Sequence, residues 1–454
     1  MASEPRSVCP VCLRPVPAHY EQHGHEVFLV KECPEHGHFS CVAWRGEPGF
    51  RQWSRPKTPS FPKSPGTPVE RGCPLDCGLC AAHGQHTCTA LIEITWRCDL
   101  SCAFCFASAG GPVRPDMDEP HVARLLEGVM AVSGPCNIQF SGGEPGLHPE
   151  LPAFISRAKA MGFPFVQLNT NGLRAAREDG FAESLAAAGL DSVFLQFDST
   201  EDAAFQRLRG RPLLAEKLRA VRSFVRAGIG VVLVPTVVPG VNDHDLGGLL
   251  RLAASLSPGV RGLHFQPVSY FGRFPARPRD DQRITLPEIM AGLEEQTRGE
   301  VRASDFLPPG CEHSRCSFHA NYLVEEDGSL KRVSARNAAC SCVSSSGQPP
   351  IVASEGANKA KAFVSRQWAA PPSITLPMTG AAPADDLDRF LARAATHMLA
   401  VSGMAFQDAW NLDLERLRGC CIHVAAPDGR LIPFCAYNLT AMDGTPLYRD
   451  TSHV

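Results

Sequence analysis

The sequence TWRCDLSCAFC occupies residues 95–105 and follows a short apolar run, residues 91–95, of the kind that forms a β-strand. Its three cysteines, Cys98, Cys102 and Cys105, have the spacing CxxxCxxC, with an aromatic residue directly before the third. An iron-sulfur cube held by three thiolates keeps one iron open, and that iron can chelate a ligand with an amine and a carboxylate. The stretch therefore predicts a 4Fe-4S cluster with an open coordination position.

Apolar runs and helical patterns alternate downstream of these cysteines, as βαβ units require. Six strands in this rhythm predict an α/β fold with a parallel sheet, curved or closed, whose site lies at the carboxyl ends of the strands. The expected strands are residues 91–95, 137–140, 165–169, 192–197, 230–237 and 262–268. The expected helices between them are residues 120–132, 149–161, 181–188, 215–227 and 245–256.

A second motif, SGGEP at residues 141–145, stands at the end of the second expected strand. Glycines let the backbone approach a ligand closely, and the carboxylate of Glu144 can accept hydrogen bonds from an ammonium group. Together with the open iron, this motif fits a cluster that binds the methionyl end of S-adenosylmethionine (SAM).

The combination CxxxCxxC, GGEP and NTNG (residues 169–172), each at the end of a successive strand, resembles the radical SAM superfamily over residues 88–275. The resemblance implies a partial (βα)6 barrel and a cluster bound by Cys98, Cys102 and Cys105. A zinc knuckle on an ordinary α/β domain is the alternative for these cysteines. The SAM contacts implied are Phe104 at the adenine, Gly142, Gly143 and Glu144 at the methionine amine, and Asn171 and Asp198 at the ends of the third and fourth strands.

The composition narrows the class of protein further. The 454 residues carry 44 Lys plus Arg against 47 Asp plus Glu, which leaves no broad basic face for nucleic acid. No apolar run is long enough to span a bilayer, so we expect a protein at most peripheral to a membrane. The first residues resemble no export signal, and we predict a cytoplasmic location. In a reducing compartment the 19 cysteines point to metal binding rather than disulfides.

Residues 1–50 contain CPVC (residues 9–12) and CPEH (residues 33–36), two knuckles that can close one tetrahedral site. Three thiolates and one imidazole favour zinc or a mononuclear iron. We assign Cys9, Cys12, Cys33 and His36 as ligands, with Cys41 as an alternative to His36. Proline recurs every third residue from Pro56 to Pro68, which is typical of a semi-rigid spacer.

Two further cysteine sets predict auxiliary 4Fe-4S clusters. The first is Cys73, Cys77, Cys80 and Cys88, for which zinc is the competing metal. The second is Cys311, Cys316, Cys421 and Cys435, where Cys420 can replace Cys421, and Cys340 and Cys342 are unassigned. Cys136 is expected in the core. The expected division of the chain is a metal knuckle (1–50), a Pro-rich linker (51–72), an auxiliary-cluster segment (73–90), the barrel (91–277) and a C-terminal auxiliary-cluster region (278–454).

Past residue 278 the pattern loosens, and residues 343–385, rich in Ser, Pro, Ala and Gly, predict a long surface segment. A helix over residues 386–401 and a strand-turn-strand around Asp428 and Gly429 are expected after it.

A narrower resemblance covers nearly the whole chain. The CPLDCGLC block (residues 73–80), FQPVS (265–269) with GR (272–273), FQDA (406–409) and IPFCAYN (432–438) are similar to the archaeal tetraether lipid synthase and pterin-methylase branch. The resemblance implies reductive cleavage of SAM and use of the 5′-deoxyadenosyl radical for carbon-carbon bond formation or methyl transfer on a lipid or small molecule. It also implies an electron donor such as a reductase, flavodoxin or ferredoxin.

Two other classes remain open from the sequence. A radical SAM maturase that modifies peptides also has C-terminal auxiliary clusters. A noncatalytic metal scaffold would explain the cysteines but not GGEP at the end of a strand.

Overall fold

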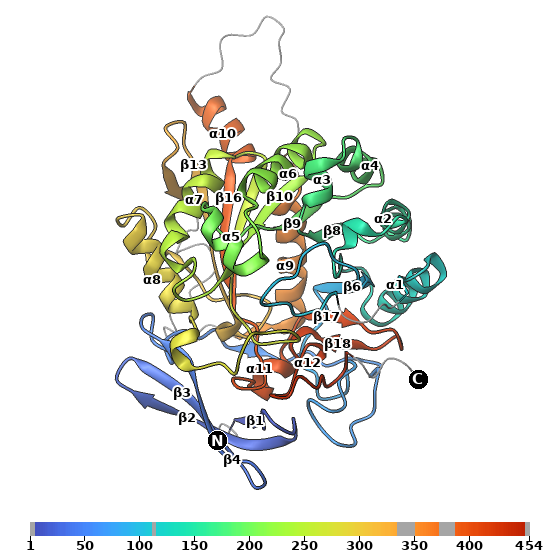
Figure 1. Cartoon of the computed structure of the whole chain (residues 1–454), viewed down its shortest axis with the longest axis vertical. Helices are drawn as coiled ribbons and strands as arrows, with labels where there is room; N and C mark the ends of the chain where they lie inside the picture. The colour runs from blue at the N-terminus through green and yellow to red at the C-terminus, as the bar shows by residue number, and fades with distance from the viewer. Residues whose placement is uncertain (1–4, 111–114, 334–349, 372–385, 450–454) are drawn as a thin grey trace, which may run out of the picture.

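The computed structural model describes residues 5–110, 115–333, 350–371 and 386–449 (Figure 1). Cys340 and Cys342, left unassigned above, lie outside the described residues. Among the described residues, no helix is long and apolar enough to cross a membrane.

The N-terminal part folds into a small antiparallel sheet at the lower end of the view in Figure 1. Alternating buried and exposed residues along its strands leave one face packed and the other in solvent. The strands, in the order in which they pair, are β1 (Arg6–Val8), β2 (Pro15–His23), β3 (Glu26–Cys33) and β4 (Gly37–Arg45).

The six predicted parallel strands are confirmed, and they pair in sequence order. Their residues are almost all buried, as expected for a sheet that is covered on both faces. The fifth predicted strand is split by Pro235 into two short ones. The observed strands are β6 (Thr89–Thr95), β7 (Asn137–Gly142), β8 (Phe165–Thr170), β9 (Ser192–Gln196), β10 (Gly230–Val234) with β11 (Thr236–Val237), and β12 (Val260–Pro267).

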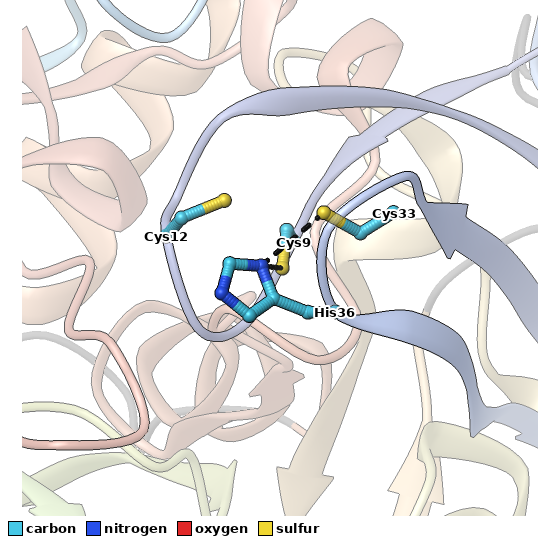
Figure 2. A group of neighbouring side chains, drawn as sticks. All are labelled: Cys9, Cys12, Cys33 and His36. Atoms are coloured by element: carbon cyan, nitrogen blue, oxygen red, sulfur yellow. Dashed lines mark hydrogen bonds between the residues drawn. The ribbon is translucent and has the colours of Figure 1, made fainter.

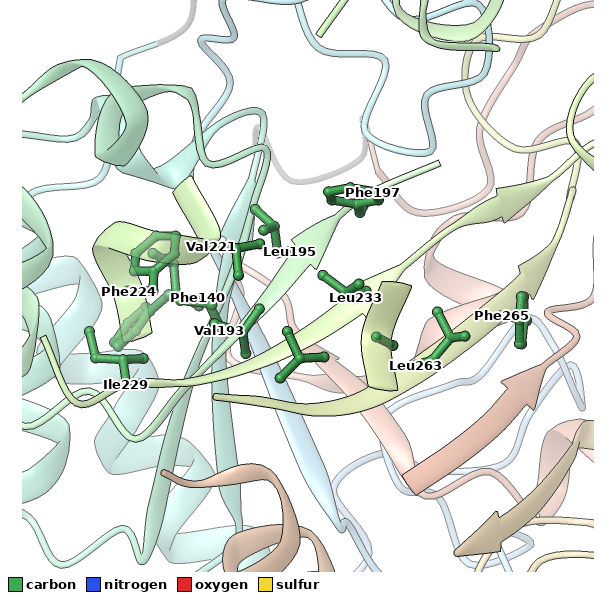
Figure 3. Packing of buried hydrophobic residues seen from close by; sticks show 14 of the residues in the cluster. Phe140, Val193, Leu195, Phe197, Val221, Phe224, Ile229, Leu233, Leu263 and Phe265 are labelled. Atoms are coloured by element: carbon green, nitrogen blue, oxygen red, sulfur yellow. The ribbon is translucent and has the colours of Figure 1, made fainter. Parts of the chain in front are cut away.

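Helices cover one face of this sheet, and the five predicted helices are confirmed. Asp118 caps the first of them by accepting from the amide of His121. Strand and helix side chains form one large apolar cluster, part of which Figure 3 shows with Phe140 and Leu195 from strands and Phe224 from a helix. The helices are α1 (Glu119–Ser133), α2 (Leu151–Ala160), α3 (Leu173–Arg177), α4 (Phe181–Ala187), α5 (Asp202–Arg209), α6 (Leu214–Arg226), α7 (Leu246–Ser255) and α8 (Leu286–Gln296).

The C-terminal region extends the sheet at both edges. The predicted helix over residues 386–401 is wrong over its last five residues, because α10 (Asp386–Thr396) is followed by strand β16 (Met398–Met404). β16 pairs parallel to β12, so its apolar residues are buried by the sheet. β13 (Ser317–Val324) and β14 (Leu330–Arg332) continue this edge. The expected strand-turn-strand is confirmed as β17 (Ile422–Ala425) and β18 (Leu431–Pro433), and β17 pairs parallel to β6.

The surface segment predicted for residues 343–385 is also corrected. Its described part contains β15 (Ile351–Val352), which pairs with β5 (Lys57–Thr58), and the sixteen-residue helix α9 (Ala353–Trp368). Ala357 in α9 is fully buried beside Cys88, and Trp368 packs against β9 and β10. Small residues and alanines make this helix hard to recognise from composition, because only contacts with the sheet define its buried side. Two short helices, α11 (Leu414–Arg418) and α12 (Phe434–Tyr437), complete the described elements.

Candidate active site and metal centres

The three sequence motifs meet at the carboxyl ends of β6, β7 and β8. The amide of Gly143 donates to the carbonyl oxygen of Thr95 at 2.7 Å, and the amide of Glu144 donates to that of Arg97, also at 2.7 Å. The GGEP turn is therefore bonded directly to the loop that carries the cysteines.

Both glycines of this turn are required by the close approach of the two loops. A Cβ on Gly143 would lie 2.2 Å from the carbonyl oxygen of Arg97. Gly142 has a φ of +132°, and a Cβ there would lie 2.3 Å from the carbonyl oxygen of Thr95. Any larger residue would push the cysteine loop away from the sheet.

Glu144 is buried and held by three donors. Its Oε1 accepts from the amide of Gly146 at 2.8 Å and from the Thr170 hydroxyl at 2.6 Å, and its Oε2 accepts from the amide of Asn171 at 2.6 Å. Burial raises the pKa of this carboxyl group to about 7. A cationic partner such as an ammonium group would lower that pKa again and hold the carboxylate ionised.

Asn171 links the third strand end to the cysteine loop. Its side-chain amide donates to Oδ1 of Asp99 at 2.7 Å, and its own side-chain oxygen accepts from the amide of Leu173. The contact with Asp99 was not expected from the sequence, because Asp99 lies between two cysteines and has no pattern of its own.

Asp198 sits at the end of β9 with no exposed side-chain surface. Its two oxygens accept from Arg209 at 2.7 and 2.8 Å, and the amide of Thr236 donates to it as well. The guanidinium of Arg209 also lies beside the Cys102 thiol. The direct SAM contact predicted for Asp198 stays a prediction, and the structure shows a carboxylate that orients Arg209.

Lys217 brings a second cation to the same edge of the sheet. It is fully buried, and its Nζ donates to the carbonyl oxygen of Asn171 at 2.6 Å and to Oε1 of Gln196 at 2.8 Å. Burial lowers the pKa of Lys217 to about 8. Neither Arg209 nor Lys217 was expected from the sequence. Their signal was weak, since Arg209 ends a short helix that was not predicted and Lys217 looks like a surface residue of an amphipathic helix.

The cysteine loop is held in place by the GR pair at residues 272–273, which belongs to the motifs shared with the lipid synthase and pterin-methylase branch. Arg273 and Cys105 exchange two backbone hydrogen bonds of 2.9 and 3.0 Å, and the Arg273 side chain donates to the carbonyl oxygens of Cys102 and Ala109. Phe104 lies 5.8 Å from the ring of Tyr270, edge to face. The contact with adenine predicted for Phe104 stays a prediction.

Cys98, Cys102 and Cys105 are partly buried on one loop, and the amide of Ala109 donates to Sγ of Cys105 at 3.4 Å. Burial raises the pKa of Cys98 to about 12, which a metal would reverse because a bound thiol is deprotonated. Three thiols on a short loop, with a cation beside them and an amide donor to one sulfur, fit a three-cysteine iron-sulfur cluster.

The four predicted ligands of the N-terminal knuckle come together. Cys9, Cys12, Cys33 and His36 have their ligand atoms within 4.8 Å of one another, and Figure 2 shows them converging from two turns. Nδ1 of His36 lies 3.4 Å from Sγ of Cys33 and 3.6 Å from Sγ of Cys9. Cys41, the alternative ligand, is buried in a different apolar cluster. The set is that of a closed structural metal site.

The predicted grouping of the auxiliary cysteines is corrected. Cys88 does not join Cys73, Cys77 and Cys80; its thiol lies with those of Cys311 and Cys421, all three within 4.8 Å of one another and buried. The reason is the pairing of β6 with β17, because the amide of Cys88 donates to the carbonyl oxygen of Cys421 at 2.8 Å.

The remaining auxiliary cysteines line two cavities. Cys73, Cys77 and Cys80 line one, and Cys316, Cys420 and Cys435 line the other, with Cys421 at its edge. The two cavities share Leu417 and are therefore neighbours. Cys420, which the sequence left open, lies near Cys435, and Cys420 and Cys421 both line the cavity of Cys316 and Cys435. Cys136 is fully buried in the main core, as expected.

Known proteins resemble this chain along nearly its whole length. Residues 92–253 match the family described as the radical SAM superfamily, and residues 1–45 match the HMPTM N-terminal zinc ribbon domain. The 7,8-dihydro-6-hydroxymethylpterin dimethyltransferase of Methanocaldococcus jannaschii is 34% identical over 478 aligned residues, which cover 96% of this chain and 94% of the relative. This chain is a radical SAM enzyme.

Other relatives of this radical SAM enzyme match about half of the chain. A GTP 3′,8-cyclase of Heliobacterium modesticaldum is 30% identical over 45% of the chain and 62% of the relative. A PqqA peptide cyclase of Xanthomonas campestris pv. campestris is 30% identical over 49% of the chain and 58% of the relative. The enzyme accordingly shares SAM and a 4Fe-4S cluster with its superfamily, and its zinc ribbon and further cysteine groups fit auxiliary metal sites.

Proposed function

We propose that this enzyme transfers a SAM-derived methyl carbon to a pterin-type ring. The observation that carries the proposal is the similarity to a pterin dimethyltransferase from one end of the chain to the other, which includes the zinc ribbon and the barrel. The narrower sequence motifs indicated the same branch.

The residues at the carboxyl edge of the sheet have separate roles in this proposal. A cluster at Cys98, Cys102 and Cys105 supplies, when bound, the electron that cleaves SAM to methionine and a 5′-deoxyadenosyl radical. Glu144 accepts from the methionine ammonium group, beside the donors that already orient its oxygens. Lys217, which lies near Glu144, and Arg209, which lies beside Cys102, are the cations that would compensate the charge of the methionine carboxylate. Together they hold SAM across the ends of β7, β8 and β9.

The auxiliary cysteines serve metal centres in the same proposal. We assign one centre to the cavity of Cys73, Cys77 and Cys80, one to that of Cys316, Cys420 and Cys435, and one to the triad Cys88, Cys311 and Cys421. We expect a flavodoxin, ferredoxin or other reductase to supply electrons, and no nucleic-acid partner.

The experiment is a reaction with anaerobically reconstituted enzyme, methyl-labelled SAM, a reductant and 7,8-dihydro-6-hydroxymethylpterin, followed by mass spectrometry. We expect a pterin product that carries labelled carbon and forms only when 5′-deoxyadenosine also forms. Deuterium placed on candidate substrate carbons should appear in 5′-deoxyadenosine if hydrogen is abstracted there. Formation of 5′-deoxyadenosine with no labelled pterin would contradict the proposed substrate and leave the superfamily assignment intact.

Peptide modification is the second candidate, favoured by the similarity of the barrel to a peptide cyclase. It is weaker because that similarity covers only 49% of this chain and 58% of the relative. Comparison of cells with and without the gene separates the two. A pterin species lost with the gene supports methylation of a pterin, whereas a changed peptide mass with unaltered pterins supports the maturase.

A further inference from the structure

The strands of the barrel have two chemically different faces. In β7, Ile138 and Phe140 belong to the apolar core under the helices, whereas Asn137, Gln139 and Ser141 alternate with them and therefore point to the other face. The face turned away from the helices is thus polar in this strand.

The same alternation recurs in β8 and β12, whereas β9 and β10 carry the apolar Phe194, Val232 and Val234 on this face. In β8, Val166 and Leu168 belong to the core, while Gln167 and Asn169 lie on the opposite face. In β12, Leu263 and Phe265 belong to the core. In the same strand, His264 and Gln266 alternate with these two residues and lie on the opposite face. Ser192 in β9 and Ser402 in β16 lie on that face as well.

Register places three of these side chains in one row. Gln139 is the direct neighbour of Gln167, and Gln167 that of Ser192. Nε2 of Gln139 donates to Oε1 of Gln167 at 2.8 Å, and Nε2 of Gln167 donates to the Ser192 hydroxyl at 3.3 Å. Nδ2 of Asn169 donates to the Ser141 hydroxyl at 3.2 Å. Glu93 lies on the same face in β6, and its carboxylate forms an ion pair with Arg449 through two hydrogen bonds.

Two buried polar groups beside this row have no hydrogen-bond partner among the described residues. Asn137 is 2% exposed, and neither its Oδ1 nor its Nδ2 is bonded. Nε1 of Trp368, whose ring packs 5.3 Å from Phe194 and 6.2 Å from His264, is likewise unbonded. A buried polar group left without a partner costs about 1–3 kcal/mol, so these groups are expected to meet water or a ligand.

We propose that this amide face, defined as Asn137, Gln139, Gln167, Asn169 and Gln266, binds the polar edge of a nitrogen heteroaromatic ring and so selects such a ring over an acyl chain. The inference rests on the proposed function, which it deepens by naming the residues that recognise the substrate. Side-chain amides offer both donors and acceptors, which match the alternating ring nitrogens, amino group and carbonyl of a pterin.

The position of the amide face agrees with this role. Asn169 precedes Asn171 by two residues on one strand, so the amide face begins about 7 Å below the edge where SAM is held. Asn169 and Gln266 are only half-buried. A ring that meets these two residues presents its carbons toward the SAM site.

An acyl chain on this face would instead cover the unbonded groups of Asn137 and Trp368 without bonding them. Each amide left unbonded would cost about 1–3 kcal/mol, and sites built to hydrogen-bond a substrate strongly reject analogues that lack the matching groups. The amide face therefore favours the pterin alternative over the lipid alternative that the sequence left open.

The test measures binding of 6-hydroxymethylpterin to the cluster-loaded enzyme in the presence of SAM, by quenching of pterin fluorescence. Gln167→Leu and Gln266→Leu keep the side-chain size and remove the hydrogen-bonding groups. We expect each to weaken pterin binding at least tenfold. Gln22→Leu, an exposed change in the N-terminal sheet, is the matched control and should leave pterin affinity as in the wild type.

Each result has a distinct meaning. If the wild type binds the pterin and both barrel variants bind it equally well, the amide face is not the recognition surface, although the proposed function stands. If the wild type binds guanine or another nitrogen heterocycle in place of the pterin, with the same loss in the variants, the proposed substrate fails and the amide face is supported. Should Gln167→Leu fail to fold, the half-exposed Gln266 decides the outcome.

Discussion

The backbone amide of Cys88 donates a hydrogen bond of 2.8 Å to the carbonyl oxygen of Cys421, two residues from opposite ends of the chain. This bond places both thiols with that of Cys311, next to the buried Ala357 of α9. The barrel sheet, its C-terminal extension and α9 therefore share one group of potential metal ligands.

Replacing Cys311 with serine should remove one metal centre and leave the others. Cys136→Ser is the matched control, because Cys136 is also buried but its side chain belongs to the main apolar core. We expect the Cys311→Ser enzyme to lose iron or zinc on elemental analysis after anaerobic purification, while Cys136→Ser keeps the wild-type content. Equal metal in the two variants would rule out the triad as a metal site.

Cys102→Ala should abolish reductive cleavage of SAM. A cluster left with two thiolates is lost or loses the geometry that chelates SAM. The measurement is 5′-deoxyadenosine formed by reduced enzyme, with Cys136→Ser again as control. Cleavage at the wild-type rate by the Cys102→Ala enzyme would show that the cluster is held elsewhere.

Glu144→Gln should chiefly weaken SAM binding. The change removes a charge-assisted hydrogen bond worth about 1.5–3 kcal/mol, which corresponds to a rise in the dissociation constant of roughly 10- to 150-fold. Equilibrium binding of SAM to the cluster-loaded protein measures this. Glu178→Gln, at an exposed carboxylate that pairs with Arg174, provides the control and should bind SAM normally. An unchanged dissociation constant in Glu144→Gln would separate Glu144 from the SAM site.

Acid should destabilise the fold partly through His264. Burial lowers the pKa of His264 to about 4, against about 6.5 in an unfolded chain. As the pH falls, the unfolded state therefore binds the proton before the folded state does. The neutral ring contributes about 3 kcal/mol to the free energy of unfolding above pH 6.5, and this contribution is lost between about pH 6.5 and pH 4.

His264→Gln should reduce this sensitivity, so its melting temperature should fall less than that of the wild type between pH 7 and pH 5. His25→Gln, at a side chain that is 84% exposed, should follow the wild-type curve. Parallel curves for wild type and His264→Gln would show that His264 titrates normally.

The barrel and the SAM motifs could be predicted because their signals are local. Buried parallel strands appear as short apolar runs, and CxxxCxxC, GGEP and NTNG each follow one such run. The two glycines of GGEP are needed because adjacent strand ends touch, and strand order alone brings those ends together. Glu144 and Asn171 were found for the same reason.

Arg209 and Lys217 were missed because they reach the site from helices. Nothing in a helical pattern distinguishes a lysine that points to solvent from one that bends over the end of a strand. Only the packing of α6 against β9 buries Lys217 and brings its Nζ to Gln196. The helix α9 was missed because its buried side is defined by contacts with the sheet and with Cys88.

The sequence by itself determined the parallel barrel, and it predicted that Cys9, Cys12, Cys33 and His36 lie together, because each half of that knuckle is a closely spaced pair. The assignment of Cys98, Cys102 and Cys105 to a cluster stays a prediction. The tertiary structure alone decided how the remaining cysteines group. Cys88 has three neighbouring cysteines in sequence, yet it lies with Cys311 and Cys421, because the parallel pairing of β6 with β17 joins distant segments. Long-range strand pairing leaves no periodic trace in the sequence, and so spacing could not predict that group.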